Sequence, residues 1–172
     1  MTQVHIGRKE DAVCLLARHA VGLRYEDLPA EVVDITKRGI LDTLGVILAA
    51  SGIMPEVKAF VGLVKQMGGR EESTILGFGD KVPAWHAGYV NGLMSHLMDY
   101  DDLHPVCGHI NAPVLPAVLA VAERRGEVNG KEFIAAAAAA VDLLCRLVLA
   151  TGRGGHDHQW NPMPVAGVFA AT

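Results

Sequence analysis

Apolar residues recur at helical spacing along most of the chain. The spacing predicts helices over residues 10–22, 30–50, 56–67, 83–98, 114–125 and 131–151, and a further apolar segment over residues 165–171. Residues 73–77, Ser-Thr-Ile-Leu-Gly, are the one strand candidate, because they include β-branched residues and run into a turn that contains glycine. The pattern therefore predicts a mainly α fold, a multi-helix bundle with at most one short pair of strands.

Two predicted helices carry more detailed signals. Residues 40–50 are apolar almost all round, so we expect this stretch to be central, with Gly45 marking a close approach of helices and Ser51-Gly52 ending the helix. Asn129 precedes Glu132 by three residues, which is a variant of the capping box at the start of the helix over 131–151.

Composition adds an expectation about the surface. The sequence is 51% hydrophobic and only 5% aromatic, and its mean hydropathy of +0.27 is high for a small chain. We interpret this as excess apolar surface that needs a cover, either another subunit or a missing part of the same protein.

Charge and cysteine usage exclude some classes of protein. The net charge is −4 and no basic run is longer than the two residues Arg124-Arg125, which argues against nucleic-acid binding. The helix over 131–151 carries Asp142 and Arg146 at i, i+4, so we expect a buried protein helix and no membrane span. Three scattered cysteines and an opening stretch without the apolar core of a signal peptide indicate a cytoplasmic protein.

Residues 95–109 concentrate the polar chemistry of the chain. This stretch lies between apolar segments and contains no lysine or arginine. It holds three carboxylates and three imidazoles, namely Asp99, Asp101, Asp102, His96, His104 and His109. Such groups, when buried, have shifted pKa values, and they are candidates for proton transfer.

Two other interpretations of the same residues are open. If a helix continues to residue 102, His96, Asp99 and Asp102 share one face, which would form the site, and Asp101 points away. In the structural interpretation, the aspartates before Pro105 only bind backbone N–H groups. The spacing H-x-x-D followed by D-x-H also suits a divalent metal, but H-E-x-x-H and D-D-x-x-D are absent, so we expect no metal.

Three neighbouring features have a functional and a structural interpretation. His109 precedes the helix that starts near Pro113, where free N–H groups favour an anion such as a substrate carboxylate, although a histidine bonded to backbone is the common alternative. We expect Cys107 to be a small buried hydrophobe and no nucleophile. His156-Asp157-His158 is expected to be solvated in a glycine-rich loop.

The motifs of this chain, taken in order, resemble the N-terminal part of the MmgE/PrpD family over about residues 10–172. The matching residues are 41–45, 74–77, Asn91-Gly92, His96, 99–102 (D-Y-D-D), His104, His109, 116–123 and Cys145-Arg146. The resemblance implies a large helical domain and proton transfer, without a cofactor, next to a carboxylate of a small di- or tricarboxylate. It implies Asp99 and His109 as catalytic residues, and His104, Asp102 and Asn161 as substrate-binding residues.

The chain departs from the family pattern at two positions. Leu103 stands where the family commonly has threonine, and Asn161 stands where the family has a site histidine. An amide can hydrogen-bond a substrate but cannot exchange protons near neutral pH, so these departures predict a different substrate or reaction, or a chain without catalysis.

The family resemblance also implies missing parts. Relatives are longer and carry a second, α/β domain, so we expect residues 1–172 to form a single, incomplete helical domain without it. We expect a subunit of a lyase or isomerase of dehydratase, decarboxylase or epimerase type, completed by a second polypeptide, by further copies of itself, or by both. The alternatives are a non-catalytic helical interaction subunit and a truncated relative of such an enzyme.

Overall fold

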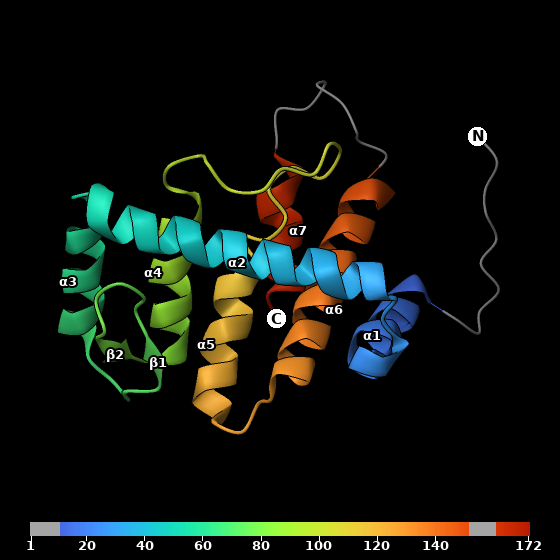
Figure 1. The fold of residues 1–172 in the computed structure, drawn as a ribbon, viewed down its shortest axis with the longest axis horizontal. Coiled ribbons are helices and arrows are strands. Elements are labelled where there is room, and N and C mark those ends of the chain that lie inside the picture. The colour runs from blue at the N-terminus through green and yellow to red at the C-terminus, as the bar shows by residue number, and fades with distance from the viewer. Residues whose placement is uncertain (1–10, 152–160) are drawn as a thin grey trace.

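The computed structural model describes residues 11–151 and 161–172 and confirms a mainly α fold (Figure 1). The α-helices are α1 (Ala12–Gly22), α2 (Ala30–Ile53), α3 (Val57–Met67), α4 (Ala84–His96), α5 (Leu115–Arg125), α6 (Gly130–Ala150) and α7 (Pro162–Ala170). A 3₁₀ turn, η1 (Tyr25–Asp27), joins α1 to α2, and β1 (Ser73–Thr74) pairs antiparallel with β2 (Lys81–Val82) in the register Ser73↔Val82. The expected short strand pair is therefore present.

Helix α2 crosses the helices α4, α5 and α6, which run beside one another behind it in Figure 1. The most extensive helix contact in the described structure joins α4 to α5, and α2 packs on both α4 and α6. One core cluster lies between α2, α3, α4 and the strand pair, around Ile47, Val90 and Met94. A second cluster joins α6 and α7 to the loop before α5 through Leu144, Val148 and Cys107, and it anchors the loop that carries the candidate site.

Side chains cap the starts of the last two helices, the first as predicted and the second as the structure shows. The Asn129 side chain accepts hydrogen bonds from the N–H groups of Lys131 and Glu132, and the Glu132 carboxylate accepts one from the Asn129 N–H, so the predicted capping box is confirmed. Asn161 caps α7 in the simpler way, by accepting from the Met163 N–H at 3.1 Å. Both caps satisfy donors that a helix start leaves without an intrahelical partner.

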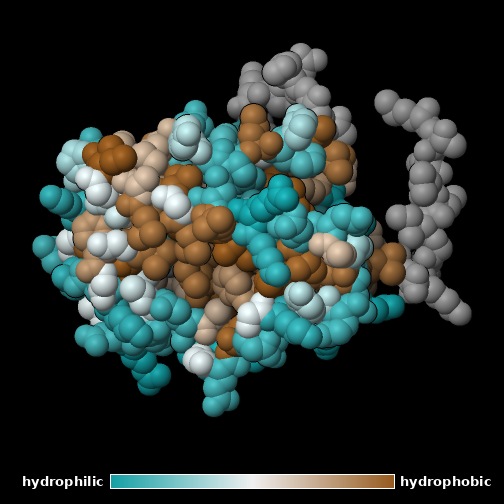
Figure 2. All heavy atoms as spheres, in the orientation of Figure 1, coloured by the Kyte–Doolittle hydropathy of each residue, from teal (hydrophilic) through white to brown (hydrophobic). Residues whose placement is uncertain are grey.

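The predictions for the second half of α2 are wrong in two respects. The helix continues through Ser51-Gly52 to Ile53, and a side chain at Gly45 would meet no atom within 4 Å, so this glycine marks no close approach. Only one side of α2 faces the bundle. The other side leaves Leu41 and Leu48 exposed by 73% and 54%, and Figure 2 shows an apolar patch across the face on which α2 lies.

Helix α6 is long and apolar enough to cross a membrane by length and composition, and 33% of its most apolar window is buried. It packs on α1, α2, α5 and α7. Its charged pair forms as predicted, with Arg146 Nε donating to Asp142 Oδ2 at 2.7 Å, and His19 Nε2 lies 2.9 Å from the same oxygen. These contacts are those of a helix inside a bundle.

Candidate functional site

The acid and imidazole residues gather where α4 gives way to the loop before α5. Helix α4 ends at His96, so residues 97–102 do not continue it and the predicted shared face of His96, Asp99 and Asp102 does not form. Asp99 has φ of 50°, the only positive φ among the described non-glycine residues. Asp is one of the few residue types that visit this left-handed conformation, and here the conformation turns the chain out of the helix.

Asp101, which was expected to point away, is the buried centre of the cluster. Its side chain is 0% exposed and its Oδ1 lies 2.8 Å from His96 Nδ1, in a hydrogen bond. Its Oδ2 lies 3.1 Å from His109 Nδ1, but this contact is not aligned as a hydrogen bond, and both atoms lack another partner among the described residues. The rings of His96 and His109 lie 4.5 Å apart, centroid to centroid.

Asp99 and His109, the two predicted catalytic residues, face each other across the mouth of the cluster. His109 Nε2 lies 3.4 Å from Asp99 Oδ1. The Asp99 side chain is 81% exposed and the His109 side chain 21% exposed, so the pair is open to a small molecule from the Asp99 side. Catalytic hydrogen bonds are often long before substrate binds, so this distance suits a pair that tightens around a ligand.

His104 and Asp102, the predicted substrate-binding residues of the loop, bind backbone. His104 Nδ1 accepts from the N–H groups of Val106 and Cys107, and its own backbone exchanges two hydrogen bonds with Gly108. Asp102 Oδ1 accepts from the Asn111 N–H at 3.2 Å. Burial raises the pKa of Asp102, although hydrogen bonds from the backbone of Asn111 and Ile110 oppose the rise. Both residues hold the loop in shape, and their contact with a substrate stays a prediction.

Asn161 lies apart from this loop in the chain and serves as the N-cap of α7. Its amide oxygen is occupied by the Met163 N–H. Its role toward a substrate therefore stays a prediction. His156-Asp157-His158 lies outside the described residues.

Cys107 is buried, as predicted for a small hydrophobe, with 2% of its surface exposed. Its sulfur lies 3.9 Å from the backbone oxygen of Cys145. Burial and the neighbouring Cys107 raise the pKa of Cys145 to about 12. With its raised pKa the Cys145 thiol stays protonated near neutral pH and is a poor nucleophile.

Four side chains of the cluster have the geometry for a divalent ion. One ligand atom each from His96, Asp99, Asp101 and His109 lies within 4.8 Å of the others. Nitrogen and carboxylate ligands of this kind suit Zn²⁺ or Mn²⁺. The same atoms also pair among themselves, since each imidazole already has a carboxylate beside it. We therefore keep the expectation of a metal-free site and test it below.

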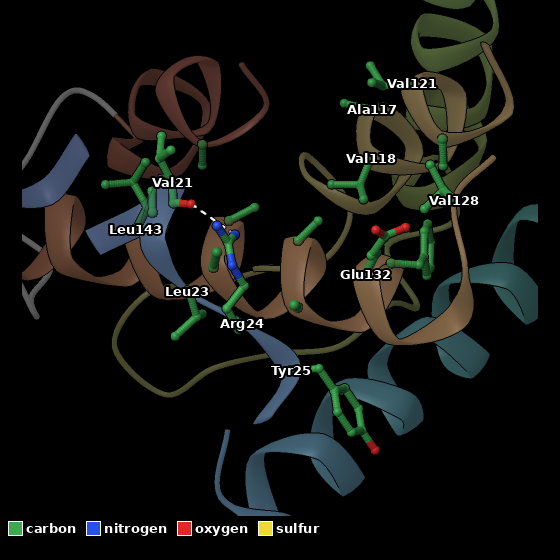
Figure 3. A pocket seen from close by; sticks show the side chains of 18 of the residues that line it. Val21, Leu23, Arg24, Tyr25, Ala117, Val118, Val121, Val128, Glu132 and Leu143 are labelled. Atoms are coloured by element: carbon green, nitrogen blue, oxygen red, sulfur yellow. Dashed lines mark hydrogen bonds between the residues drawn. The ribbon is translucent and has the colours of Figure 1, made fainter. Parts of the chain in front are cut away.

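A large hollow of the described structure lies away from this cluster. It has a volume of about 990 Å³ and is lined by residues of α1, η1, α5, α6 and the end of α7, with Val121, Leu143 and Phe169 on its apolar walls. Figure 3 shows its Arg24 donating to the Val21 carbonyl, with Glu132 on the facing helix. No residue of the acid and imidazole cluster lines it. Its walls therefore add to the apolar surface that the chain leaves uncovered.

Comparison with known proteins places the sequence in a family. The profile of the MmgE/PrpD N-terminal domain matches residues 15–172. The chain is 29% identical to a human (Homo sapiens) cis-aconitate decarboxylase over 157 residues, which cover 88% of this chain and 32% of that protein. It is also 29% identical to a mouse (Mus musculus) cis-aconitate decarboxylase over 133 residues, 74% of this chain and 27% of that protein.

The chain thus spans about a third of the curated relatives that it matches. The match is to lyases, and it includes the whole acid and imidazole loop. On the family match over residues 15–172, the chain belongs to the MmgE/PrpD family, as its N-terminal domain.

Proposed function

We propose that this chain supplies the proton-transfer residues of a lyase or isomerase that acts next to a carboxylate of a small di- or tricarboxylate. The observation that supports this proposal best is the Asp99–His109 pair, with Oδ1 and Nε2 3.4 Å apart and Asp99 open to solvent. A carboxylate and an imidazole at this distance can pass a proton between them and to a bound molecule. The related cis-aconitate decarboxylases make cis-aconitate the first molecule to test.

In this proposal Asp99 exchanges a proton with the substrate carbon beside the carboxylate. Its carboxylate is exposed by 81%, whereas His109 lies behind it and is mostly buried. His109 then holds or returns the proton through Nε2, or binds the substrate carboxylate when it is charged. A positioned general acid or base contributes about 10²–10⁴-fold to a rate. The neighbouring His104 and Asp102 keep the loop folded around the pair.

The backbone of Asp99 supports a special role for this position. A φ of 50° is costly for most side chains, and such conformations concentrate at functional sites. Here the left-handed turn, closed by the Asp99 N–H donating to the His96 carbonyl, directs the Asp99 side chain toward His109.

We also propose that another polypeptide, a second copy of this chain, or both cover its apolar faces and complete the site. Large side chains on several helices are more than half exposed; they include Leu41, Leu48, Val121, Val165, Val168 and Phe169. Exposed apolar surface, such as that on the face along which α2 lies (Figure 2), marks interaction sites in soluble proteins. A site cluster open on its Asp99 side agrees with completion by residues from outside the described chain.

A non-catalytic interaction subunit is the second candidate. Leu103, which is 70% exposed, offers no hydroxyl to the site, and the Asn161 amide oxygen is used as a helix cap. Those two residues favour this alternative. The close pairing of Asp99 with His109 opposes it, since a subunit without catalysis has no need of that pair.

Deuterium exchange tests catalysis without knowing the reaction type. The chain, in the assembly in which it occurs, is incubated in D₂O with one of three small tricarboxylates: cis-aconitate, 2-methylcitrate or citrate. Mass spectrometry then measures deuterium at carbons next to a carboxylate, and product formation. We expect exchange or product with at least one compound, and a 10²–10⁴-fold loss in Asp99→Asn. The control Asp34→Asn, which removes an exposed carboxylate paired with Arg38, should leave the rate unchanged.

Two results would count against the proposal. Full exchange in Asp99→Asn with the assembly intact would remove Asp99 from the reaction, and no exchange with any of the three compounds would favour the interaction subunit. Incubation with a chelator should leave the rate unchanged. A loss that added Zn²⁺ or Mn²⁺ restores would instead assign His96, Asp99, Asp101 and His109 to a metal.

A further inference from the structure

Asp101 is the carboxylate that the rest of the cluster surrounds. It has no exposed side-chain surface, and no lysine or arginine pairs with it among the described residues. Its two oxygens instead each face the Nδ1 atom of one imidazole, His96 at 2.8 Å and His109 at 3.1 Å. A buried carboxylate needs donors on its oxygens, so both rings are favoured with their N–H at Nδ1.

A proton held at Nδ1 of His109 determines what the other ring nitrogen, Nε2, can do. A neutral imidazole carries one N–H, so a proton held at Nδ1 leaves Nε2 with a lone pair. That lone pair faces Asp99 Oδ1 at 3.4 Å, and two acceptors repel unless one of them is protonated. The lone pair on His109 Nε2 is therefore placed to accept a proton from Asp99 or from a bound molecule beside it. This is the proton that a transfer reaction would use.

We infer that Asp101 is a positioning residue: it fixes the His109 ring with its N–H at Nδ1, so that Nε2 faces Asp99 as a proton acceptor. His96 assists by donating to Oδ1 of Asp101 and by packing its ring 4.5 Å from that of His109. The consequence for turnover depends on the proposed function, whereas the tautomer of His109 does not. The Asp101–His109 contact is not aligned as a hydrogen bond, and we expect a small rotation of the His109 ring to align it when Asp99 binds a ligand.

The tautomer test needs no substrate. In the purified chain labelled with ¹⁵N, the side-chain nitrogen shifts of His109, assigned with a His109→Gln variant, report which nitrogen carries the proton when the ring is neutral. We expect the Nδ1–H form in at least tenfold excess in the wild-type chain. In Asp101→Asn and Asp101→Ala this excess should fall at least tenfold, because the carboxylate acceptor is gone. A wild-type ring protonated at Nε2 would overturn the inference without any variant.

A matched control separates positioning from general loss of stability. Glu123 is a partly buried carboxylate that accepts from the N–H and the hydroxyl of Thr74, outside the cluster. Glu123→Gln should lower the free energy of unfolding and leave the His109 tautomer unchanged. If Glu123→Gln moves the tautomer as far as Asp101→Asn does, Asp101 acts only through stability and the inference fails.

Turnover supplies the second measurement. With the compound that shows exchange, Asp101→Asn should lower kcat 10²–10⁴-fold with KM changed less than threefold, as expected when the tautomer of a catalytic imidazole is wrong. Asp101→Glu, which keeps a carboxylate, should recover part of kcat. A tautomer that responds to Asp101 in a chain without exchange refutes the proposed function alone; an unchanged tautomer refutes the positioning role alone.

Discussion

At the scale of single residues, the site loop contains two kinds of acid. Asp101 and Asp99 face imidazoles. Asp102 instead faces a backbone N–H group, and its partial burial disfavours the charged form of its carboxyl group. Burial raises the pKa of Asp102, since the charged form loses more hydration than the hydrogen bonds return. The loop is thus folded at some cost in stability near neutral pH, as is common where function constrains a buried acid.

The raised pKa of Asp102 predicts how stability depends on pH. Its contribution to the free energy of unfolding is fully present below the unfolded-state pKa, near pH 4, and is lost as pH rises through the higher folded-state pKa. Asp102→Asn keeps an oxygen for the Asn111 N–H but does not ionise. Urea unfolding from pH 3 to 7 should therefore show the wild-type chain losing stability relative to Asp102→Asn as pH rises. A difference that is constant with pH would contradict the assignment.

At the scale of elements, the small hairpin of β1 and β2 depends on its turn and on α2. The Ile75 N–H donates to the Asp80 carbonyl, and the Ile75 carbonyl accepts from Phe78 and Gly79. Gly77 and Gly79 both have positive φ, near 80°. A side chain at Gly77 would overlap the Ser51 side chain on α2, whereas one at Gly79 would meet no atom within 4 Å. Of these two glycines, Gly77 is the one that lies against α2.

This difference predicts unequal effects of two similar substitutions. Gly79→Ala should cost about 1 kcal/mol, the usual penalty for a left-handed alanine. Gly77→Ala adds the overlap with Ser51 and should cost about 2–4 kcal/mol, since overpacking adds 1–3 kcal/mol. Thermal and urea unfolding of the two variants measure both values. If both substitutions lower the free energy of unfolding by the same amount, the contact between Gly77 and Ser51 of α2 adds nothing to the effect.

At the scale of the whole molecule, the apolar faces of α2 and of the 990 Å³ hollow are uncovered. Figure 2 shows brown, apolar residues over much of the α2 side of this surface, with teal, hydrophilic residues between them. Each large side chain that a partner buries contributes about 1.5–3 kcal/mol to association. The surface is therefore the part of the chain on which assembly with another polypeptide or another copy should depend.

Substitution on α2 tests whether this face is covered. Leu48, exposed by 54% in the chain alone, lies on the apolar side of α2. Leu48→Glu should weaken assembly of the native complex 10- to 100-fold, measured by sedimentation velocity, with an unchanged circular dichroism spectrum. Lys58→Glu, an exposed change on α3, should have little effect. Assembly that tolerates Leu48→Glu would place the partner elsewhere.

The sequence by itself predicted most of the helices, the capping box at Asn129 and Glu132, and the cluster of acids and imidazoles. These features are local: helical periodicity and caps depend on residues three or four apart. The prediction that Gly45 marks a close approach of helices was wrong. When a helix is apolar all round, its sequence does not indicate which side packs against the bundle. The end of α2 was also misplaced, since Ser51-Gly52 only weakens a helix that packing can extend.

Only the tertiary structure decided how the cluster is arranged. The order of residues 96–109 could not show that the helix ends at His96, that Asp99 turns left-handed, or that Asp101 lies between two imidazoles. Outside a regular helix or strand no period relates sequence spacing to direction, so the buried carboxylate was the one expected to point away. The sequence determined which groups are available for proton transfer, and the packing of the loop onto α6 and α7 determined which of them face one another.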